Sequence, residues 1–222
     1  METLPLFPLG TVLLPGAVLP LQLFEPRYLE LAQWLAARPE GERSFGVVLI
    51  RSGHEVGPDA VSDVHPVGCE ATVEAMGLAR GAGGAGSVVH LVATGGRRFR
   101  LEGLDEDAGT AYLTARVEWL EEPSTAEADI AEVVVQVRSA HDRYLEVVGA
   151  RGEPVEDVPG RVAYRYAEQT VLDVADRQRL LEAPDAGARL RLLLELLRRE
   201  TAIVRRFGAL PGTPDLGAAG LS

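Results

Sequence analysis

The chain has 222 residues, enough for one large domain or two small ones, and its 46% apolar content suffices for a packed core. The formal net charge of −11 opposes general attraction to nucleic acid, because an acidic surface repels phosphates. No run approaches the roughly 20 apolar residues of a membrane helix, and no basic N-terminal segment indicates a secretory signal. The lone cysteine, Cys69, cannot form an internal disulfide, so we expect a cytoplasmic protein that binds no membrane.

Prolines and a glycine interrupt the apolar residues at the start of the chain. Residues 4–24 therefore predict two or three strands that are short, bent or at a sheet edge, because proline cannot donate a backbone hydrogen bond. Pro26 fits the first turn of a helix, where its missing N–H is tolerated. Apolar residues follow at helical spacing, which predicts a short helix over about residues 26–37.

The next part of the chain has the composition and alternation of strands. The predicted strands are Ser44–Arg51, Val64–Met76, Ser87–Thr94, Arg97–Leu101 and Ala111–Leu120. The Gly- and Ala-rich run at 81–86 predicts a flexible hairpin loop rather than a phosphate-binding loop, because it opens no helix. Closing such strands on themselves removes exposed edges. We therefore predict a small, mostly antiparallel β-barrel over residues 1–121.

The apolar spacing changes to three and four residues after Pro123, which is the period of amphipathic helices. Four helices are predicted over residues 127–207, with Asp173 and Asp185 as N-caps of the last two. Residues 208–222 are rich in Gly, Pro and Ala and predict a disordered tail. The expected fold class is therefore α+β, with a barrel subdomain followed by a helical subdomain.

All 22 basic residues are arginine. Without lysine, this sequence contains neither a nucleotide-binding phosphate loop nor a Ser-Lys catalytic dyad. The four histidines lie in separate elements without metal-ligand spacing, so we expect no metal site, no cofactor and no enzymatic activity. They are His54, His65, His90 and His141. On its apolar stripe His141 is expected to be a hydrogen-bonded core residue, and Cys69 a buried small hydrophobe.

Five motifs follow in order along the chain. They are Leu4–Tyr28, Phe45–Val48, Val67–Ala71, Gly95–Leu101 and Asp176–Leu190. Together they resemble the Lon N-terminal domain family, the substrate-binding module of Lon proteases that also exists as a stand-alone protein. Arg177 stands where the family motif has lysine. The resemblance spans Leu4 to about Phe207 and implies a barrel of the PUA-like class followed by a helical bundle.

The segment Phe24, Glu25, Arg27 and Tyr28 is the candidate binding site. A structural interpretation has both aromatic rings filling the junction between barrel and helix, with Glu25 and Arg27 satisfying each other or nearby backbone. A functional interpretation makes this junction part of a groove for an extended apolar segment. The proline-interrupted strands are candidate edges for pairing with such a segment.

The resemblance implies a non-catalytic protein- or peptide-binding module. Its expected role is that of an adaptor or chaperone-like factor in protein quality control. Unfolded or peptide clients are the expected partners, and a protease or ATPase could act in trans. The alternative is an RNA-binding module, because related barrels bind RNA. Only the Arg-rich segment Arg198–Arg206 supports that alternative, and the net charge opposes it.

Overall fold

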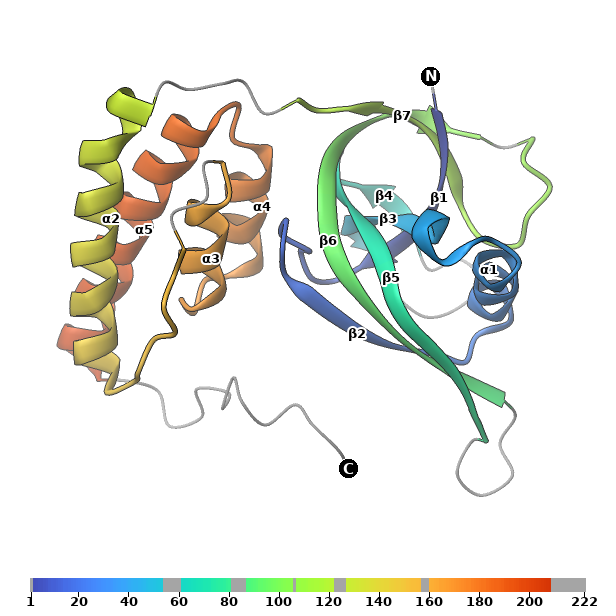
Figure 1. Cartoon of the computed structure of the whole chain (residues 1–222), viewed down its shortest axis with the longest axis horizontal. Helices are drawn as coiled ribbons and strands as arrows, with labels where there is room; N and C mark the ends of the chain where they lie inside the picture. Colours follow the sequence, from blue (N-terminus) through green and yellow to red (C-terminus); the bar gives the residue numbers. More distant parts are fainter. Residues whose placement is uncertain are drawn as a thin grey trace. The chain divides into compact units, whose positions relative to one another are not determined.

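The computed structural model describes residues 2–53, 61–80, 87–105, 107–121, 127–156 and 160–208. The chain forms two compact units (Figure 1). The sheet unit comprises Met1–Glu122 and Arg177–Glu182, and the helical unit comprises Pro123–Asp176 and Ala183–Ser222. Residues 177–182, which the sequence analysis placed in the helical subdomain, thus cluster with the sheet. The predicted loop at 81–86 and the predicted tail, apart from Gly208, lie outside the described residues.

The described residues of the sheet unit form seven strands. They are β1 (Glu2–Leu9), β2 (Val18–Leu23), β3 (Ser44–Gly53), β4 (Val61–Val64), β5 (Val67–Arg80), β6 (Ser87–Leu104) and β7 (Thr114–Trp119). Pairing runs from β1 through β7, β6, β5 and β3 back to β1, so five strands form a closed ring. Among the pairs of described strands, only β1–β3 is parallel, which confirms the prediction of a mostly antiparallel sheet. The additional strands β2 and β4 pair with β6 and β3.

Strand β1 is continuous and largely buried despite its prolines. Residues Glu2–Pro5 pair with β7, and residues Leu6–Leu9 pair with β3. Each half of the strand therefore has one described strand partner, and proline is tolerated where its missing N–H faces away from that partner. Of the predicted alternatives of a short, bent or edge strand, β1 is neither short nor at an edge of the described sheet, because it changes partner midway and closes the ring.

Strand β6 differs from the prediction of two strands separated by Gly95 and Gly96. It is one strand of 18 residues. It pairs with β2 up to Thr94 and with β7 from Phe99 onward, so the glycines mark a change of partner and not a turn. A Cβ on Gly95 would lie 2.2 Å from the Leu14 carbonyl oxygen. Glycine is needed at this position because the backbone passes too close for a side chain.

The helix α1 (Pro26–Ala36) confirms the helix predicted near residues 26–37. Its buried face consists of Tyr28, Leu31, Ala32 and Leu35. A short 3-10 turn, η1 (Glu40–Glu42), follows before β3.

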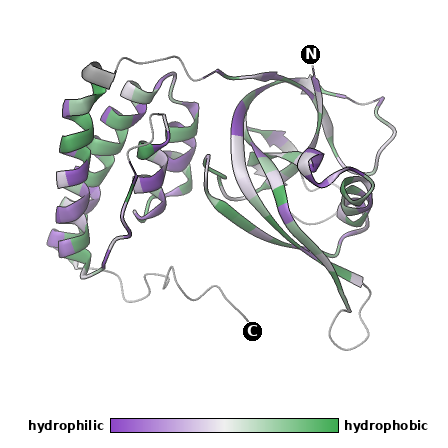
Figure 2. Cartoon of the chain, in the orientation of Figure 1, coloured by the Kyte–Doolittle hydropathy of each residue, from purple (hydrophilic) through white to green (hydrophobic). Residues whose placement is uncertain are grey.

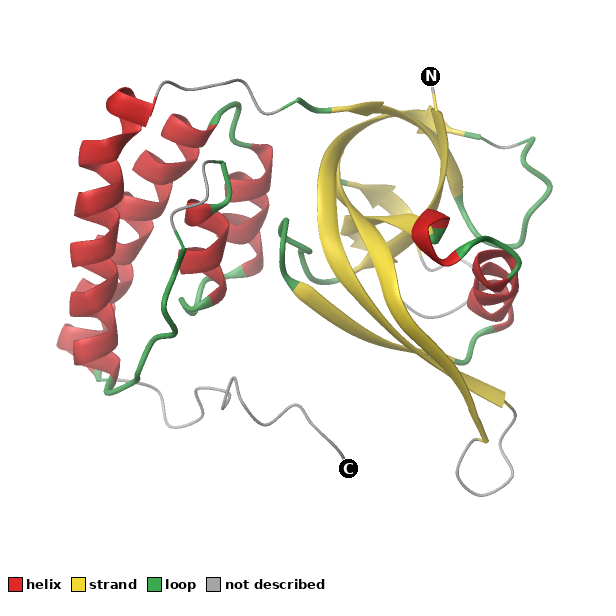
Figure 3. Cartoon of the chain, viewed as in Figure 1, coloured by secondary structure: helices red, strands yellow, loops and turns green. Residues whose placement is uncertain are grey.

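The helices after the sheet are α2 (Glu127–Val148), α3 (Val162–Glu168), α4 (Val174–Glu182) and α5 (Ala186–Phe207). Figure 3 shows the helices in red and the strands in yellow. Apart from α1, all described α-helices follow the last strand in the sequence. Both predicted caps are confirmed. Asp173 accepts a hydrogen bond from the Asp176 amide, and Asp185 accepts one from the Ala188 amide, each at 2.7 Å.

The helical unit contains a buried charge that the sequence analysis did not anticipate. Arg189 on α5 is fully buried, although arginine is almost never buried without partners. Its guanidinium lies 4.3 Å from the ring centroid of Tyr164 and donates to the Gly160 carbonyl at 3.2 Å. These contacts join α3 and the preceding loop to α5.

Candidate functional site

Tyr28 is part of the packed interior of the sheet unit. It is 5% exposed, and its ring stacks on Phe7 with 4.1 Å between centroids and 26° between planes. Phe45 lies next to Phe7, with 6.0 Å between their ring centroids. Tyr28 therefore fixes α1 to β1 and offers little surface to a partner.

Glu25 and Arg27 pair with each other at the start of α1. Arg27 Nη2 lies 3.1 Å from Glu25 Oε2, and both side chains are mostly buried. The Arg27 guanidinium also lies 4.5 Å from the centroid of the Tyr28 ring. The ion pair thus packs against the aromatic ring, so both charged side chains have a structural role at the start of α1.

Phe24 is exposed, so the interpretation that it fills the barrel–helix junction is wrong. Its exposed fraction is 58%, whereas the preceding residue, Leu23, is buried. Successive side chains of a strand point to opposite faces. Since β2 ends with Leu23 facing the core, the next side chain points outward.

Further exposed apolar side chains lie on the outward face of β2 and its neighbours. Pro20 on β2 is the register partner of Val92 on β6, which is the partner of Ala75 on β5, and all three are exposed. We call the exposed apolar set the outer apolar face; its members are Val18, Pro20, Phe24, Ala75 and Val92. Most of β2 is hydrophobic in Figure 2. This part of the sheet is therefore apolar on its outward side as well as on its core side. An exposed apolar patch of this kind is typical of a binding surface.

Four members of the outer apolar face, Val18, Pro20, Ala75 and Val92, were not predicted from the sequence. Alternation along each strand indicates which residues share a face, but not which face is covered. The strand register, which brings three strands into one row, is the missing information.

The strand β2 also has an open edge. It pairs with β6, and no other described strand pairs with it. Gly95 on β6 donates to the Ala17 carbonyl oxygen at 2.9 Å. Backbone groups in an antiparallel pair alternate in direction every residue, so those of Val18, Pro20 and Gln22 face the open edge. Pro20 has no N–H to present there, which limits uncontrolled pairing at the edge.

The histidines of the described residues lie in separate environments. His65 is 3.3 Å from Glu182, and His90 is exposed on β6, while His54 lies outside the described residues. Within the described ranges, no group of three or more His, Cys, Asp or Glu side chains could hold a metal ion. Cys69 is fully buried, as predicted for a small hydrophobe.

His141 is a core residue, as its position on an apolar stripe predicted. It is 2% exposed, and its ring centroid lies 4.9 Å from that of Tyr166. Burial lowers the pKa of His141, against smaller opposing effects from Asp142 and a backbone hydrogen bond of Gln169. The neutral imidazole is therefore the form that the helical unit accommodates.

None of the helices in the described parts of the chain is both long and apolar enough to span a bilayer.

The chain is similar to a known protein family. The model of the ATP-dependent protease La (LON) substrate-binding domain matches residues 3–199. Lon protease 2 of Myxococcus xanthus is 29% identical over 212 residues, which make up 92% of this chain and 24% of the relative. Lon protease of Anaeromyxobacter dehalogenans is 29% identical over 210 residues, with 91% and 24% covered. The chain spans 24% of the length of both curated relatives.

Solved structures show the same fold. A Lon N-terminal domain protein from Xanthomonas campestris superposes with a TM-score of 0.61 at 30% identity, covering 88% of this chain and 98% of that one. The N-terminal domain of Mycobacterium avium complex Lon protease gives a TM-score of 0.59 at 18% identity, covering 90% and 98%. The first similarity extends over almost the whole of the solved chain.

Proposed function

Since the chain belongs to the LON substrate-binding domain family, we propose that it is a non-catalytic module that binds exposed apolar segments of other proteins. The observation that carries this proposal is the outer apolar face lying beside the open edge of β2. Unfolded proteins expose both apolar side chains and unpaired backbone. A surface that offers partners for both fits such clients.

A client segment in extended conformation would add a strand to β2. The backbone groups of Val18 and Gln22 would pair with it, while Pro20 interrupts the row of donors. Main-chain hydrogen bonds would supply affinity with little dependence on sequence, and the outward side chains of β2, such as Val18, would contact alternate residues of the client. The interrupted edge predicts weak binding that needs no nucleotide.

The four residues of the predicted site have different parts in this proposal. Phe24 contacts the client directly, because its ring is exposed at the end of β2. Glu25, Arg27 and Tyr28 act as positioning residues that hold the turn between β2 and α1. The proposed binding site is therefore the outer apolar face beside the junction between barrel and helix, and not a groove at that junction.

We further propose that the module acts as an adaptor or chaperone-like factor in protein quality control. A protease or ATPase would act in trans on the client that it holds. The 222 residues contain no lysine, and therefore hold neither a phosphate loop nor a Ser-Lys dyad.

Fluorescence anisotropy with labelled apolar peptides tests the proposal. The double variant Val18→Thr/Phe24→Ser should weaken binding about tenfold, as expected when contacts at the centre of an interface are lost. Leu104→Thr is the matched control, because Leu104 is also apolar and exposed on β6 but lies outside the outer apolar face. Equal affinity for the double variant and the wild type would contradict the proposed surface.

A further inference from the structure

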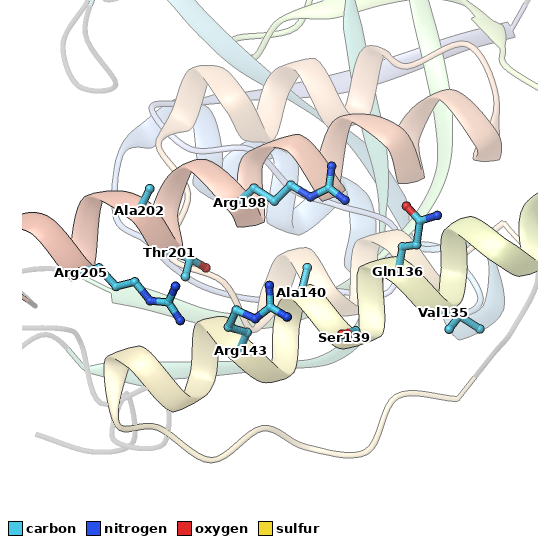
Figure 4. Close-up of a pocket in the computed structure, with 9 residues that line it drawn as sticks. All are labelled: Val135, Gln136, Ser139, Ala140, Arg143, Arg198, Thr201, Ala202 and Arg205. Atoms are coloured by element: carbon cyan, nitrogen blue, oxygen red, sulfur yellow. The ribbon is translucent and has the colours of Figure 1, made fainter.

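An open pocket of about 500 Å³ lies between the helices α2 and α5 of the helical unit (Figure 4). Its lining includes Val135, Ala140 and Arg143 from α2, and Arg198, Ala202 and Arg205 from α5. The lining therefore combines small or apolar side chains with three guanidinium groups.

The three arginines lack acidic partners among the described residues. Arg143, Arg198 and Arg205 are exposed, and none forms an ion pair with a described carboxylate. The adjacent Arg199, in contrast, pairs with Asp176 and Glu200. In a chain with 33 acidic and 22 basic residues, three unpaired arginines in one pocket are unexpected.

The spacing of the arginines defines what they can bind. Arg198 and Arg205 are seven residues apart on α5, which places them on one side of the helix about 10 Å apart. Arg143 faces the pocket from α2 (Figure 4). Guanidinium groups bind carboxylates with two parallel hydrogen bonds. Val135, at 62% exposed, supplies an apolar contact at one end of the pocket.

We propose that this pocket binds an acidic segment of a partner protein, with carboxylates at the three arginines and an apolar side chain against Val135. An acidic protein segment fits better than single-stranded RNA, because the described residues that line this pocket include no aromatic side chain on which a base could stack. The site is separate from the outer apolar face, since every residue of its lining belongs to the helical unit. The protein would then recognise two kinds of segment at two places.

The test uses two triple variants with the same change in net charge. The pocket variant is Arg143→Gln/Arg198→Gln/Arg205→Gln, and the control is Arg151→Gln/Arg191→Gln/Arg206→Gln, whose arginines are exposed outside the pocket lining. The probe is a labelled peptide of about twelve residues that alternates pairs of Glu with pairs of Leu, a length matched to a groove site. Its counterpart carries Gln in place of every Glu.

Wild type and control variant should bind the Glu peptide equally, and the pocket variant should bind it about tenfold more weakly, as the loss of three charge contacts implies. The Gln peptide should bind wild type as weakly as the Glu peptide binds the pocket variant. Because both variants have the same net charge, long-range repulsion cannot produce this difference. Equal weakening in both variants would overturn the proposal. A uridine oligonucleotide that binds the wild type tightly, and loses that binding only in the pocket variant, would overturn it in favour of RNA.

Discussion

Arg98 on β6 donates a hydrogen bond to the backbone carbonyl oxygen of Leu181 in α4, with 2.7 Å between Nη1 and the oxygen. The arginine is 3% exposed. The last carbonyl groups of a helix have no partner within the helix, and a cation near them is favourable. Gln178 of the same helix donates to the Val67 carbonyl at 3.0 Å. These contacts explain why residues 177–182 cluster with the sheet.

Arg98→Met should lower the free energy of unfolding by about 2–3 kcal/mol, because a buried hydrogen bond to a charged group is lost. Urea unfolding followed by circular dichroism measures the effect. Arg100→Met is the control; Arg100 is exposed on the same strand and its replacement should change stability by less than about 0.5 kcal/mol. Similar losses in the two variants would show that the contact to Leu181 is dispensable.

Phe24→Ala should leave the melting temperature nearly unchanged, because the ring is 58% exposed. Tyr28→Ala should instead cost about 3 kcal/mol, since it removes a buried ring stacked on Phe7. Thermal unfolding of both variants compares the two positions directly. A large loss of stability in Phe24→Ala would place that ring in the core after all.

Gly95→Ala should destabilise the protein by about 2–3 kcal/mol, because the new Cβ would meet the Leu14 carbonyl oxygen at 2.2 Å and the backbone would have to move. Gly77 on β5 provides the comparison, since a Cβ there has no described atom within 4 Å. Denaturant unfolding of the two alanine variants should therefore separate them clearly. Tolerance of Gly95→Ala would mean that the segment around Leu14 and β6 can move apart without loss of stability.

Much of the fold could be predicted because local rules and the final packing agree. The caps Asp173 and Asp185 and the helix after Pro26 depend on nearby residues alone. The role of Gly95 could not be predicted in the same way. A glycine pair between two strand patterns is typical of a turn, and only the approach of Leu14 from a distant part of the chain identifies it as a crossing point.

The candidate site was predicted less well for a related reason. Alternation of side chains correctly places Leu23 and Phe24 on opposite sides of the sheet. The sequence does not show which of these two side chains points into the core. The row formed by Pro20, Val92 and Ala75 depends on register between three strands. A one-residue change of register would exchange the two faces.

The protein should lose stability as the pH falls through the pKa of His141 in the unfolded chain, near 6.5. The buried imidazole has a lowered pKa, so below 6.5 the unfolded chain binds more protons than the folded one, and the free energy of unfolding decreases. His141→Gln removes this contribution. Its stability deficit relative to wild type should be largest above pH 6.5 and should shrink on acidification. A deficit that is constant with pH would contradict a neutral buried His141.

Amide hydrogen exchange with and without a saturating apolar peptide, followed residue by residue by NMR, tests the central claim most directly. Strand addition to β2 predicts that exchange slows at the amides of Val18 and Gln22, whose N–H groups face the open edge, while Leu19 and Leu21 change little because their N–H groups face β6. Unchanged exchange at Val18 and Gln22 in the peptide-bound protein would contradict binding at this edge.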